Sequence, residues 1–341
     1  MHSVTIIHNT FGERTDPLYP SRAGVMDQVE AVARSLERLR IDYQVEAVED
    51  LRDLTAIVGS HRRPLIFNLV EEFLSSIEQA CYVPAVCSAF DGCCTGSDTA
   101  ALLLAQNKIH TKAVLRQAGL PCPDGIVVRP ADKMQLNILA AGRYIIKPVF
   151  CDASEGISDD SIVMLPDESQ RAAELVGSLH RRFSQPVIVE QFIPHRELNV
   201  SVIDDGSVIK VLALAEIDFG AFGESRNKIV DYDAKWRKDS FTYNNTPRKI
   251  PAELPVDVAE IVKAVSVGAF EAVGCSDYAR VDFRLDEDLN PFILEVNPNP
   301  DISPDAGFAA ALQASGIRYE EFVETALHNA RRRSSEFADS Q

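Results

Sequence analysis

The chain has 341 residues, of which 46% are hydrophobic and 25% charged, and its formal net charge is −17 at pH 7. This length allows roughly two or three domains with sizeable cores. A surface this acidic repels phosphate backbones and anionic lipids, which argues against nucleic-acid and membrane partners. No apolar run approaches the roughly 20 residues that cross a bilayer, and the first residues lack the pattern of a signal peptide. The seven cysteines form no pair of CxxC motifs, which favours reduced thiols in a cytoplasmic protein.

The first hundred residues predict an N-terminal domain, residues 1–100, that contains a parallel sheet. Its apolar residues recur every three or four positions over 21–40, which predicts an amphipathic helix. Strands that alternate with helices favour parallel pairing. The expected strands are 4–8, 43–48, 64–69 and a short one near 93–94.

The next stretch predicts a small central α+β domain, residues 101–185. Ser97, Asp98 and Thr99 are typical of a helix start. A proline- and glycine-containing turn then leads into a unit of strand, helix and strand that ends at Lys147. The other expected elements are helices to Lys108 and over 109–118, a loop of small and polar residues over 151–158, a strand at 161–165 and a helix at 167–182.

The third expected unit is a C-terminal α+β domain, residues 186–332, followed by a frayed tail, residues 333–341. It contains a long loop over 216–250 and a two-stranded hairpin between about 280 and 297. The remaining expected elements are strands at 187–192, 197–204 and 207–214 and helices at 255–272, 304–314 and 318–332.

The hairpin carries the most informative pattern in the chain. Folded about a turn at residues 288 and 289, it places Asp282 opposite Glu295 and Arg280 opposite Asn297. Since strand side chains alternate between faces, all four lie on one surface. Two carboxylates and an amide oxygen suit Mg²⁺ carrying phosphates, and the arginine suits a developing oxyanion. An exposed, salt-bridged hairpin is the alternative for any single pair, but the full set favours a metal site.

Two further segments are consistent with a nucleotide site. Lys147 precedes the small-residue loop, whose backbone N–H groups are suited to phosphate oxygens. The alternative is a surface lysine that contributes little to the core. An apolar strand ends in Glu190, which is suited to the exocyclic amine of adenine, and Glu197 follows at a spacing suited to the ribose hydroxyls. An edge strand with solvated acids is the alternative there.

In order and spacing these motifs resemble ATP-grasp enzymes and, among them, the D-alanine–D-alanine ligases. The resemblance spans about residues 95–300 and implies an ATP-grasp fold of three domains, with a Rossmann-like N-terminal domain before the two α+β domains. The matching stretches are 95–97, 107–108, 118–121, 146–148, 154–156, 189–190, 196–197, 232–235, 279–282 and 295–298.

The resemblance implies an ATP site built from the second and third domains. Lys108 and Lys147 would hold the phosphates, and residues 154–158 would form a lid over them. The lid residues would include Ser154, Glu155 and Gly156, the adenine would bind along Glu190, Gln191 and Ile193, and the ribose would bind at Glu197.

The resemblance also implies a reaction. Asp282, Glu295 and Asn297 would bind two Mg²⁺ ions, for which Mn²⁺ would substitute. Lys235, in a mobile loop, would reach the γ-phosphate, and Arg280 would stabilise a tetrahedral intermediate. The implied activity is ADP-forming ligation of an amino acid or related carboxylate to an amine through an acyl phosphate. A phosphotransferase and an inactive ATP-binding module are the alternatives, and a homodimer is left open.

The segments expected to contact the small-molecule substrates depart from the family pattern. The family has a Gly-Gly turn before a glutamate that binds the first ammonium, whereas this chain offers Glu13 without the glycines. Ala306 stands where the family has a serine. Phe11, Trp236 and Phe308 are candidates to line a pocket for a larger or more apolar partner. The sequence therefore predicts the nucleotide chemistry and favours a product other than D-alanyl-D-alanine.

Overall fold

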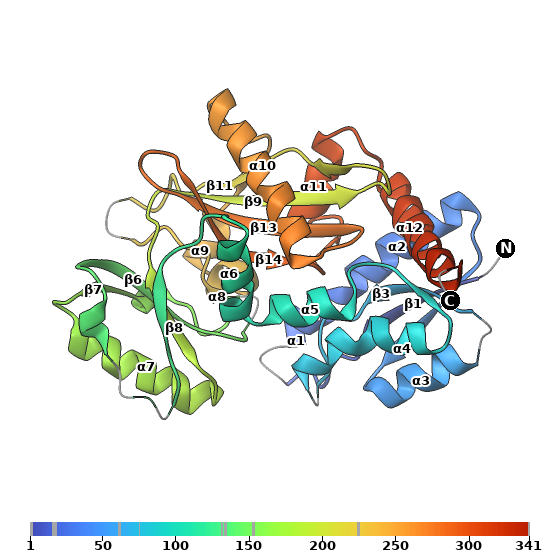
Figure 1. Cartoon of the computed structure of the whole chain (residues 1–341), viewed down its shortest axis with the longest axis horizontal. Helices are drawn as coiled ribbons and strands as arrows, with labels where there is room; N and C mark the ends of the chain where they lie inside the picture. The colour runs from blue at the N-terminus through green and yellow to red at the C-terminus, as the bar shows by residue number, and fades with distance from the viewer. Residues whose placement is uncertain are drawn as a thin grey trace.

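The structure is a computed structural model of the chain and describes residues 3–15, 19–60, 63–74, 76–130, 132, 135–151, 154–223 and 226–339. These residues form three β-sheets with helices packed around them (Figure 1). The N-terminal sheet is parallel, as the sequence predicted, and the other two are antiparallel. Within the described residues, no helix combines the length and apolar character that a membrane span needs.

The N-terminal sheet has the parallel order β2-β1-β3-β4. The helix predicted over 21–40 is two helices, since one ends at Ala23 and the next begins at Val25. Two further helices escaped prediction because seven to nine residues give little periodicity. The elements are β1 (Val4–Asn9), α1 (Tyr19–Ala23), α2 (Val25–Leu39), β2 (Tyr43–Val48), α3 (Leu51–Gly59), β3 (Leu65–Leu69), a 3₁₀ helix (Ile77–Tyr82), α4 (Val83–Ala89) and β4 (Cys93–Cys94).

The central sheet has the antiparallel order β5-β8-β6-β7. Two helices come before this sheet in the chain. Asn107 separates them, because its Oδ1 accepts hydrogen bonds from the N–H groups of Ile109 and His110. Lys108 therefore begins the second helix instead of ending the first. The helix predicted between the first two strands is only a 3₁₀ turn in the described part. The elements are α5 (Thr99–Gln106), α6 (Lys108–Gln117), β5 (Gly125–Val128), the 3₁₀ turn (Leu136–Ile138), β6 (Gly142–Pro148), a 3₁₀ turn (Asp159–Ser161), β7 (Ile162–Leu165), α7 (Ser169–Phe183) and β8 (Val187–Gln191).

The C-terminal sheet has the order β12-β11-β9-β13-β14, with β10 paired to β9. The long loop predicted over 216–250 contains two short helices and an edge strand, and its residues 224 and 225 lie outside the described part. The elements are β9 (Arg196–Asp204), β10 (Ile209–Val211), β11 (Ala215–Ile217), α8 (Tyr232–Trp236), α9 (Phe241–Asn244), β12 (Arg248–Lys249), α10 (Val256–Val273), β13 (Tyr278–Leu285), β14 (Pro291–Asn297), α11 (Gly307–Ala314) and α12 (Tyr319–Asp339).

The β13–β14 hairpin has the predicted register. Arg280 pairs with Asn297 and Asp282 pairs with Glu295. Beyond Asp282 the register shifts, so that Phe283 pairs with Ile293 and one extra residue is accommodated on β14. A β-bulge of this kind redirects neighbouring side chains and is frequent beside functional sites. It lies here directly next to Glu295.

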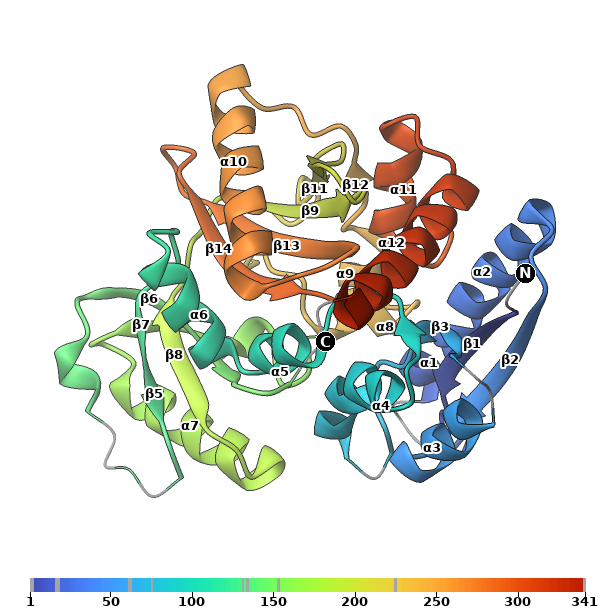
Figure 2. The ribbon, with the colours of Figure 1, turned by 45° about the vertical axis from the view of Figure 1, so that its right-hand side comes forward.

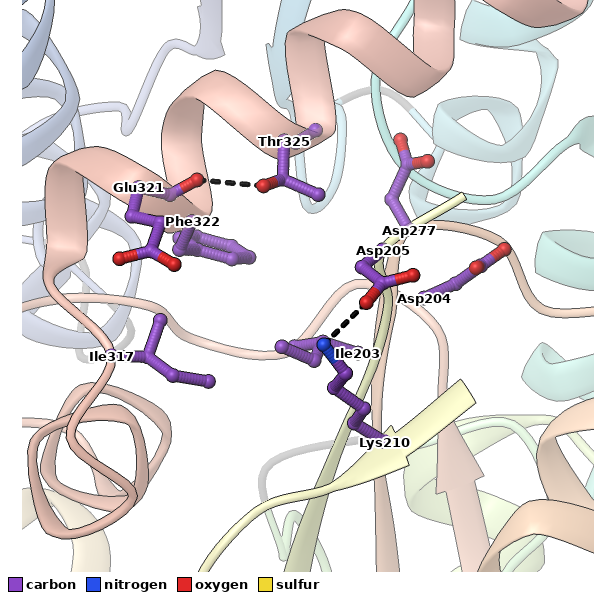
Figure 3. Close-up of a pocket in the computed structure, with 10 residues that line it drawn as sticks. Ile203, Asp204, Asp205, Lys210, Asp277, Ile317, Glu321, Phe322 and Thr325 are labelled. Carbon is purple, nitrogen blue, oxygen red and sulfur yellow. Dashed lines mark hydrogen bonds and ion pairs between the residues drawn. The ribbon is translucent and has the colours of Figure 1, made fainter. Parts of the chain in front are cut away.

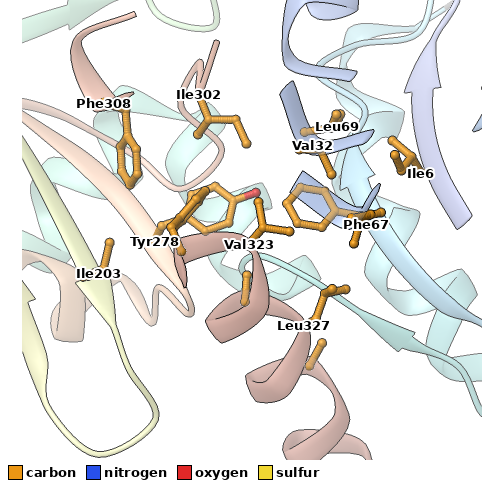
Figure 4. Packing of buried hydrophobic residues seen from close by; sticks show 14 of the residues in the cluster. Ile6, Val32, Phe67, Leu69, Ile203, Tyr278, Ile302, Phe308, Val323 and Leu327 are labelled. Atoms are coloured by element: carbon orange, nitrogen blue, oxygen red, sulfur yellow. The ribbon is translucent and has the colours of Figure 1, made fainter. Parts of the chain in front are cut away.

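Helix α12 connects the C-terminal unit to the N-terminal sheet (Figures 1 and 2). Phe67 of β3 and Val32 of α2 share one buried cluster with Val323 and Leu327 of α12 and with Tyr278 of β13 (Figure 4). The helix runs to Asp339, beyond the predicted end at residue 332. The first and third units thus share a core, which holds the N-terminal sheet beside the hairpin.

Candidate active site

The Asp282 carboxylate is fixed by two neighbours on the hairpin surface. Arg280 donates to both of its oxygens, Nε to Oδ1 at 2.7 Å and Nη2 to Oδ2 at 2.9 Å. Asn199 of β9 donates to Oδ1 at 2.9 Å. Because a carboxylate has about four acceptor positions, Asp282 retains capacity for a cation. In turn, Asp282 raises the pKa of Arg280, outweighing the burial that acts in the opposite direction.

Glu295 lies among four positive charges. Its Oε2 is 3.9 Å from the Nζ of Lys108, the first residue of α6. Burial alone would raise its pKa, but Lys108, Lys235, Arg280 and Lys147 together lower the pKa to about 2. The three lysines and the arginine come from separate segments of the chain, so only the tertiary structure brings them together. A carboxylate that stays ionised amid four cations is typical of a site for metal ions and phosphates.

The predicted metal ligands fit Mg²⁺ by their chemistry. Asp282 and Glu295 face each other across the hairpin, and Asn297 is two residues further along the same strand. The Asn297 Oδ1 accepts the Asn299 N–H at 3.0 Å, which leaves one lone pair of the amide oxygen for a metal. In the described part of the chain, no three His, Cys, Asp or Glu side chains are grouped closely enough to hold a metal. The set is therefore two carboxylates and one amide oxygen, all of them the hard donors that Mg²⁺ prefers.

Lys147 and Glu190 are buried together, which rules out the alternative of a surface lysine at the end of the strand. Lys147 Nζ forms an ion pair with Glu190 Oε1 at 2.5 Å, and Lys112 Nζ of α6 lies 3.1 Å from Oε2. The side chains are 8%, 0% and 2% exposed for Lys147, Glu190 and Lys112. Burial alone would raise the pKa of Glu190, but the two lysines outweigh it and lower this pKa. Replacing Lys147 is therefore expected to cost stability as well as ATP binding.

The residues predicted for adenine and ribose are joined by Arg284 of β13, which sequence reasoning missed. Its Nε donates to the Ile193 carbonyl at 2.8 Å, and its Nη1 donates to Glu197 Oε2 at 2.9 Å. Burial raises the pKa of Glu197, and Arg284 offsets part of this rise. Gln191 is exposed, and its N–H donates to the Asp124 carbonyl at 2.7 Å. The Glu190 carboxylate, which was expected to accept from the amine of adenine, pairs instead with Lys112 and Lys147.

The predicted lid contacts the loop that carries Lys235. Ser154 Oγ donates to the Val230 carbonyl at 2.8 Å, and the Tyr232 N–H donates to the Ile157 carbonyl at 3.4 Å. Gly156 has a φ of +76°, and a Cβ there would lie 2.8 Å from Pro148 Cγ, so this turn requires glycine. Glu155 beside it is half-buried. The segment predicted to form the lid and the loop that carries Lys235 therefore lie in contact.

The residues predicted to contact the substrates are brought together less closely than those predicted for metal and phosphate. Glu13 is exposed, and its one described hydrogen bond comes from Thr15 Oγ1 at 3.4 Å. Phe308 is 1% exposed and stacks edge-on against Tyr278 at 5.8 Å between ring centroids, so its predicted role in lining a pocket is wrong. Phe11 packs against the same buried cluster and against Tyr19. Both aromatic rings serve packing, whereas Trp236 is half-buried on α8 next to Lys235.

A separate small pocket lies between α12 and the β9–β10 segment (Figure 3). Its volume is about 50 Å³, enough for very few water molecules. Asp204, Asp205, Asp277 and Lys210 line it, and Lys210 pairs with Asp205. None of the residues predicted from the sequence for ATP, metal or substrate lines this pocket. It is therefore distinct from the hairpin surface.

Comparison with known proteins agrees with this geometry. A sequence profile of the family described as "D-ala D-ala ligase C-terminus" matches residues 114–328, more than half of the chain. The D-alanine–D-alanine ligase of Bordetella pertussis is 33% identical over 237 residues, which cover 69% of each chain. The chain belongs to the D-alanine–D-alanine ligase family. As a member of this family it is an ATP-dependent ligase, which confirms the predicted class of enzyme.

Two further proteins are similar to this chain over a comparable length. The D-alanine–D-alanine ligase of Bordetella avium is 31% identical over 243 residues, 69% of each chain. An uncharacterized protein, y4sG, of Sinorhizobium fredii is 28% identical over 269 residues, 79% of this chain and 75% of that protein. The profile match includes the hairpin but begins after Lys108 and Glu13. The family resemblance in sequence is thus concentrated in the second and third units.

Solved structures of the family confirm the predicted ATP-grasp fold over nearly the whole chain. The D-alanine–D-alanine ligase of Bacillus anthracis complexed with ATP has a TM-score of 0.74 at 19% identity, covering 98% of this chain and 99% of that one. The enzyme of Coxiella burnetii has a TM-score of 0.72 at 16% identity, covering 99% and 97%. The N-terminal unit, which precedes most of the profile match, therefore shares the family fold.

Proposed function

We propose that this ligase joins an amino acid or related carboxylate to an amine through an acyl phosphate, and that it releases ADP. The observation that carries the proposal is Glu295, an ionised carboxylate amid Lys108, Lys147, Lys235 and Arg280. Phosphoryl transfer is promoted mainly by positioning and by offsetting negative charge, and this arrangement supplies both. Relatives named as D-alanine–D-alanine ligases support the same type of reaction.

The first half of the reaction would use the cations. Lys108, Lys147 and Lys235 would bind the ATP phosphates while the substrate carboxylate attacks the terminal phosphorus and ADP leaves. Asp282, Glu295 and Asn297 would hold two Mg²⁺ ions, or Mn²⁺ in their place, and the bound metal would offset phosphate charge. Residues 154–158 and the segment around Val230 would exclude water, because water would hydrolyse the acyl phosphate.

The second half would use Arg280. When the amine attacks the acyl phosphate, the carbonyl oxygen becomes an oxyanion, and a guanidinium beside it lowers the barrier. The tetrahedral intermediate would then expel inorganic phosphate, and the amine nitrogen would lose a proton, which leaves the amide. Asp282 holds that guanidinium through two hydrogen bonds, so it needs little reorganisation during the reaction. This group favours a ligase over a phosphotransferase, because a simple phosphoryl transfer forms no tetrahedral carbon.

The substrates are expected to be small molecules, and the setting is expected to be a reducing compartment such as the cytoplasm. The seven cysteines in the described part of the chain are free thiols, which is typical of that setting. The adenine is expected to bind along residues 190–193 and the ribose beside Glu197. Glu13 is proposed as the ammonium anchor for the first substrate.

The reaction is tested by a product assay across amino acids supplied singly and in pairs. Wild-type enzyme with Mg²⁺ is expected to release ADP only when both partners are present and to yield a condensed product by mass spectrometry. Release of AMP and pyrophosphate would rule the mechanism out, and ADP release with one phosphorylated partner would indicate a phosphotransferase. D-Alanine alone is not expected to be the best substrate. If D-alanine alone gives the highest kcat/KM and yields the homodipeptide, the departures from the family pattern around Glu13 and Ala306 do not affect substrate choice.

Glu13→Ala is expected to raise the KM of the first substrate about tenfold or more while leaving the KM of ATP nearly unchanged. Loss of a charged hydrogen-bond partner for an ammonium costs about 1.5–3 kcal/mol. Steady-state kinetics with each substrate varied in turn measures the effect. Glu30→Gln, on the exposed face of α2, is the control and should leave both constants unchanged. Equal KM values in the Glu13 variant and the wild type would remove Glu13 from the site.

A further inference from the structure

A second arginine stands beside the catalytic surface on the edge strand β12. The Nη1 of Arg248 donates to the Asp305 carbonyl at 3.0 Å, in the loop that leads from β14 to α11. That bond ties the edge strand to the segment that follows the proposed metal ligands. Arg248 is therefore held in a defined position, with part of its surface buried and part exposed.

Gly307 lies against the Nε side of the Arg248 guanidinium, where a larger residue would make close contact. A Cβ at residue 307 would lie 3.3 Å from Nε and 3.4 Å from Cδ of Arg248. Nε and Nη2 form the edge of a guanidinium that binds a carboxylate through two parallel hydrogen bonds. In the described part of the chain neither of these two nitrogens of Arg248 donates a hydrogen bond, and Arg248 forms no ion pair. The arginine thus offers a bidentate donor edge that the protein itself does not use.

Through Asp305 and Gly307, Arg248 lies against the loop that follows the proposed metal ligands, and its charge interacts with that of Arg280. Burial lowers the pKa of Arg248, the charge of Arg280 lowers it further, and Asp301 and Asp305 act in the opposite direction. The two arginines differ in their partners. Arg280 is held by the Asp282 carboxylate, whereas the one partner of Arg248 among the described residues is a backbone carbonyl. An anion that enters beside Arg280 would therefore find in Arg248 a guanidinium that pairs with no carboxylate in the described part of the chain.

We propose that Arg248 binds the carboxylate of the amine substrate and so selects amino acids over simple amines. The inference rests on the proposed ligase function and adds the residue that recognises the acceptor. The amine nitrogen of the acceptor has to reach the acyl phosphate beside Arg280, and in an amino acid the carboxylate is only two bonds from that nitrogen. Anchoring the carboxylate on a second, adjacent guanidinium orients the nitrogen toward the carbonyl carbon.

The test compares an amino-acid acceptor with the same amine lacking the carboxylate, for example alanine with ethylamine, at saturating ATP and donor. The amino acid used in this comparison is the best acceptor found in the product assay. Wild-type enzyme is expected to favour the amino acid strongly. Arg248→Gln is expected to raise the KM of the amino-acid acceptor about 10- to 100-fold, to leave the KM of ATP unchanged and to reduce the preference over the simple amine by a similar factor. Arg248→Lys should restore part of the preference.

Two further variants separate recognition from structure. Lys249→Gln removes the same charge from the next residue of β12, where the side chain pairs with Asp218 at 3.0 Å, and it should leave the acceptor KM within about twofold. Gly307→Ala covers the open edge of Arg248 and should raise the acceptor KM without removing any charge. An Arg248→Gln variant that keeps the wild-type KM and preference overturns the assignment while the ligase function stands. Absence of ADP release by wild-type enzyme with every pair overturns the ligase function and this inference with it.

Discussion

Glu295→Gln is expected to lower kcat by about 10²–10⁴, which corresponds to about 3–5 kcal/mol of transition-state free energy. The substitution keeps the shape of the side chain and removes the negative charge that lies between Lys108, Lys235, Arg280 and Lys147. A metal ion then loses a charged ligand at the point where phosphate charge has to be offset. The Mg²⁺ concentration needed for half-maximal rate is expected to rise in parallel.

The measurement is the rate of ADP release as a function of Mg²⁺, with circular dichroism to establish that the variant is folded. Glu287→Gln is a matched control, because Glu287 is exposed in the turn of the same hairpin. It should retain wild-type turnover and Mg²⁺ dependence. A folded Glu295 variant with near wild-type turnover would show that the hairpin does not hold the metal.

Glu190→Gln is expected to destabilise the fold by about 3–5 kcal/mol, because it leaves the buried cations Lys112 and Lys147 without their shared counter-charge. The carboxylate is 0% exposed, so water cannot replace it. The variant should melt several degrees below the wild type. ATP is expected to recover part of the loss, since its phosphates would bring negative charge to Lys147.

The pKa shift of Glu190 predicts the direction in which the loss of stability in Glu190→Gln changes with pH. The pKa of Glu190 is lowered from its ordinary value near 4.5 in the folded chain, since the two lysines outweigh burial. Its contribution to stability is thus complete above about pH 4.5 and is lost as the pH falls through the folded-state pKa. The stability gap between wild type and variant should shrink below about pH 4.5.

Thermal and chemical unfolding across this pH range, with and without ATP, measures the effect. Glu260→Gln is the control, because its ion pair with Lys263 is 65% exposed at the glutamate and should contribute less than about 1 kcal/mol. A Glu190 variant as stable as wild type at pH 7 would show that the buried lysines do not depend on the negative charge of Glu190. A gap that widened in acid would contradict the direction of the pKa shift.

The sequence by itself determined the hairpin and the chemistry of its surface. The alternation of apolar and polar residues and the polar turn establish the pairing of Asp282 with Glu295, because a strand has a period of two and a tight turn sets its centre. The same local reasoning placed the acidic and amide ligands on one face, and the order and spacing of motifs along the chain gave the resemblance to the family. It could not reveal the bulge beyond Asp282, because an extra residue in one strand leaves no mark in the periodicity.

Only the tertiary structure decided which distant charges meet. Lys112 on α6 and Lys147 on β6 converge on Glu190 of β8, and a lysine within a helix looks in sequence like any solvated residue. Arg284 and Arg248 likewise acquire their partners from other strands and loops. The burial of Phe308 also depends on where α12 packs. The periodicity of a segment reflects the geometry of one helix or strand. Ion pairs and packing depend on how separate elements are brought together, and that arrangement is a property of the whole chain.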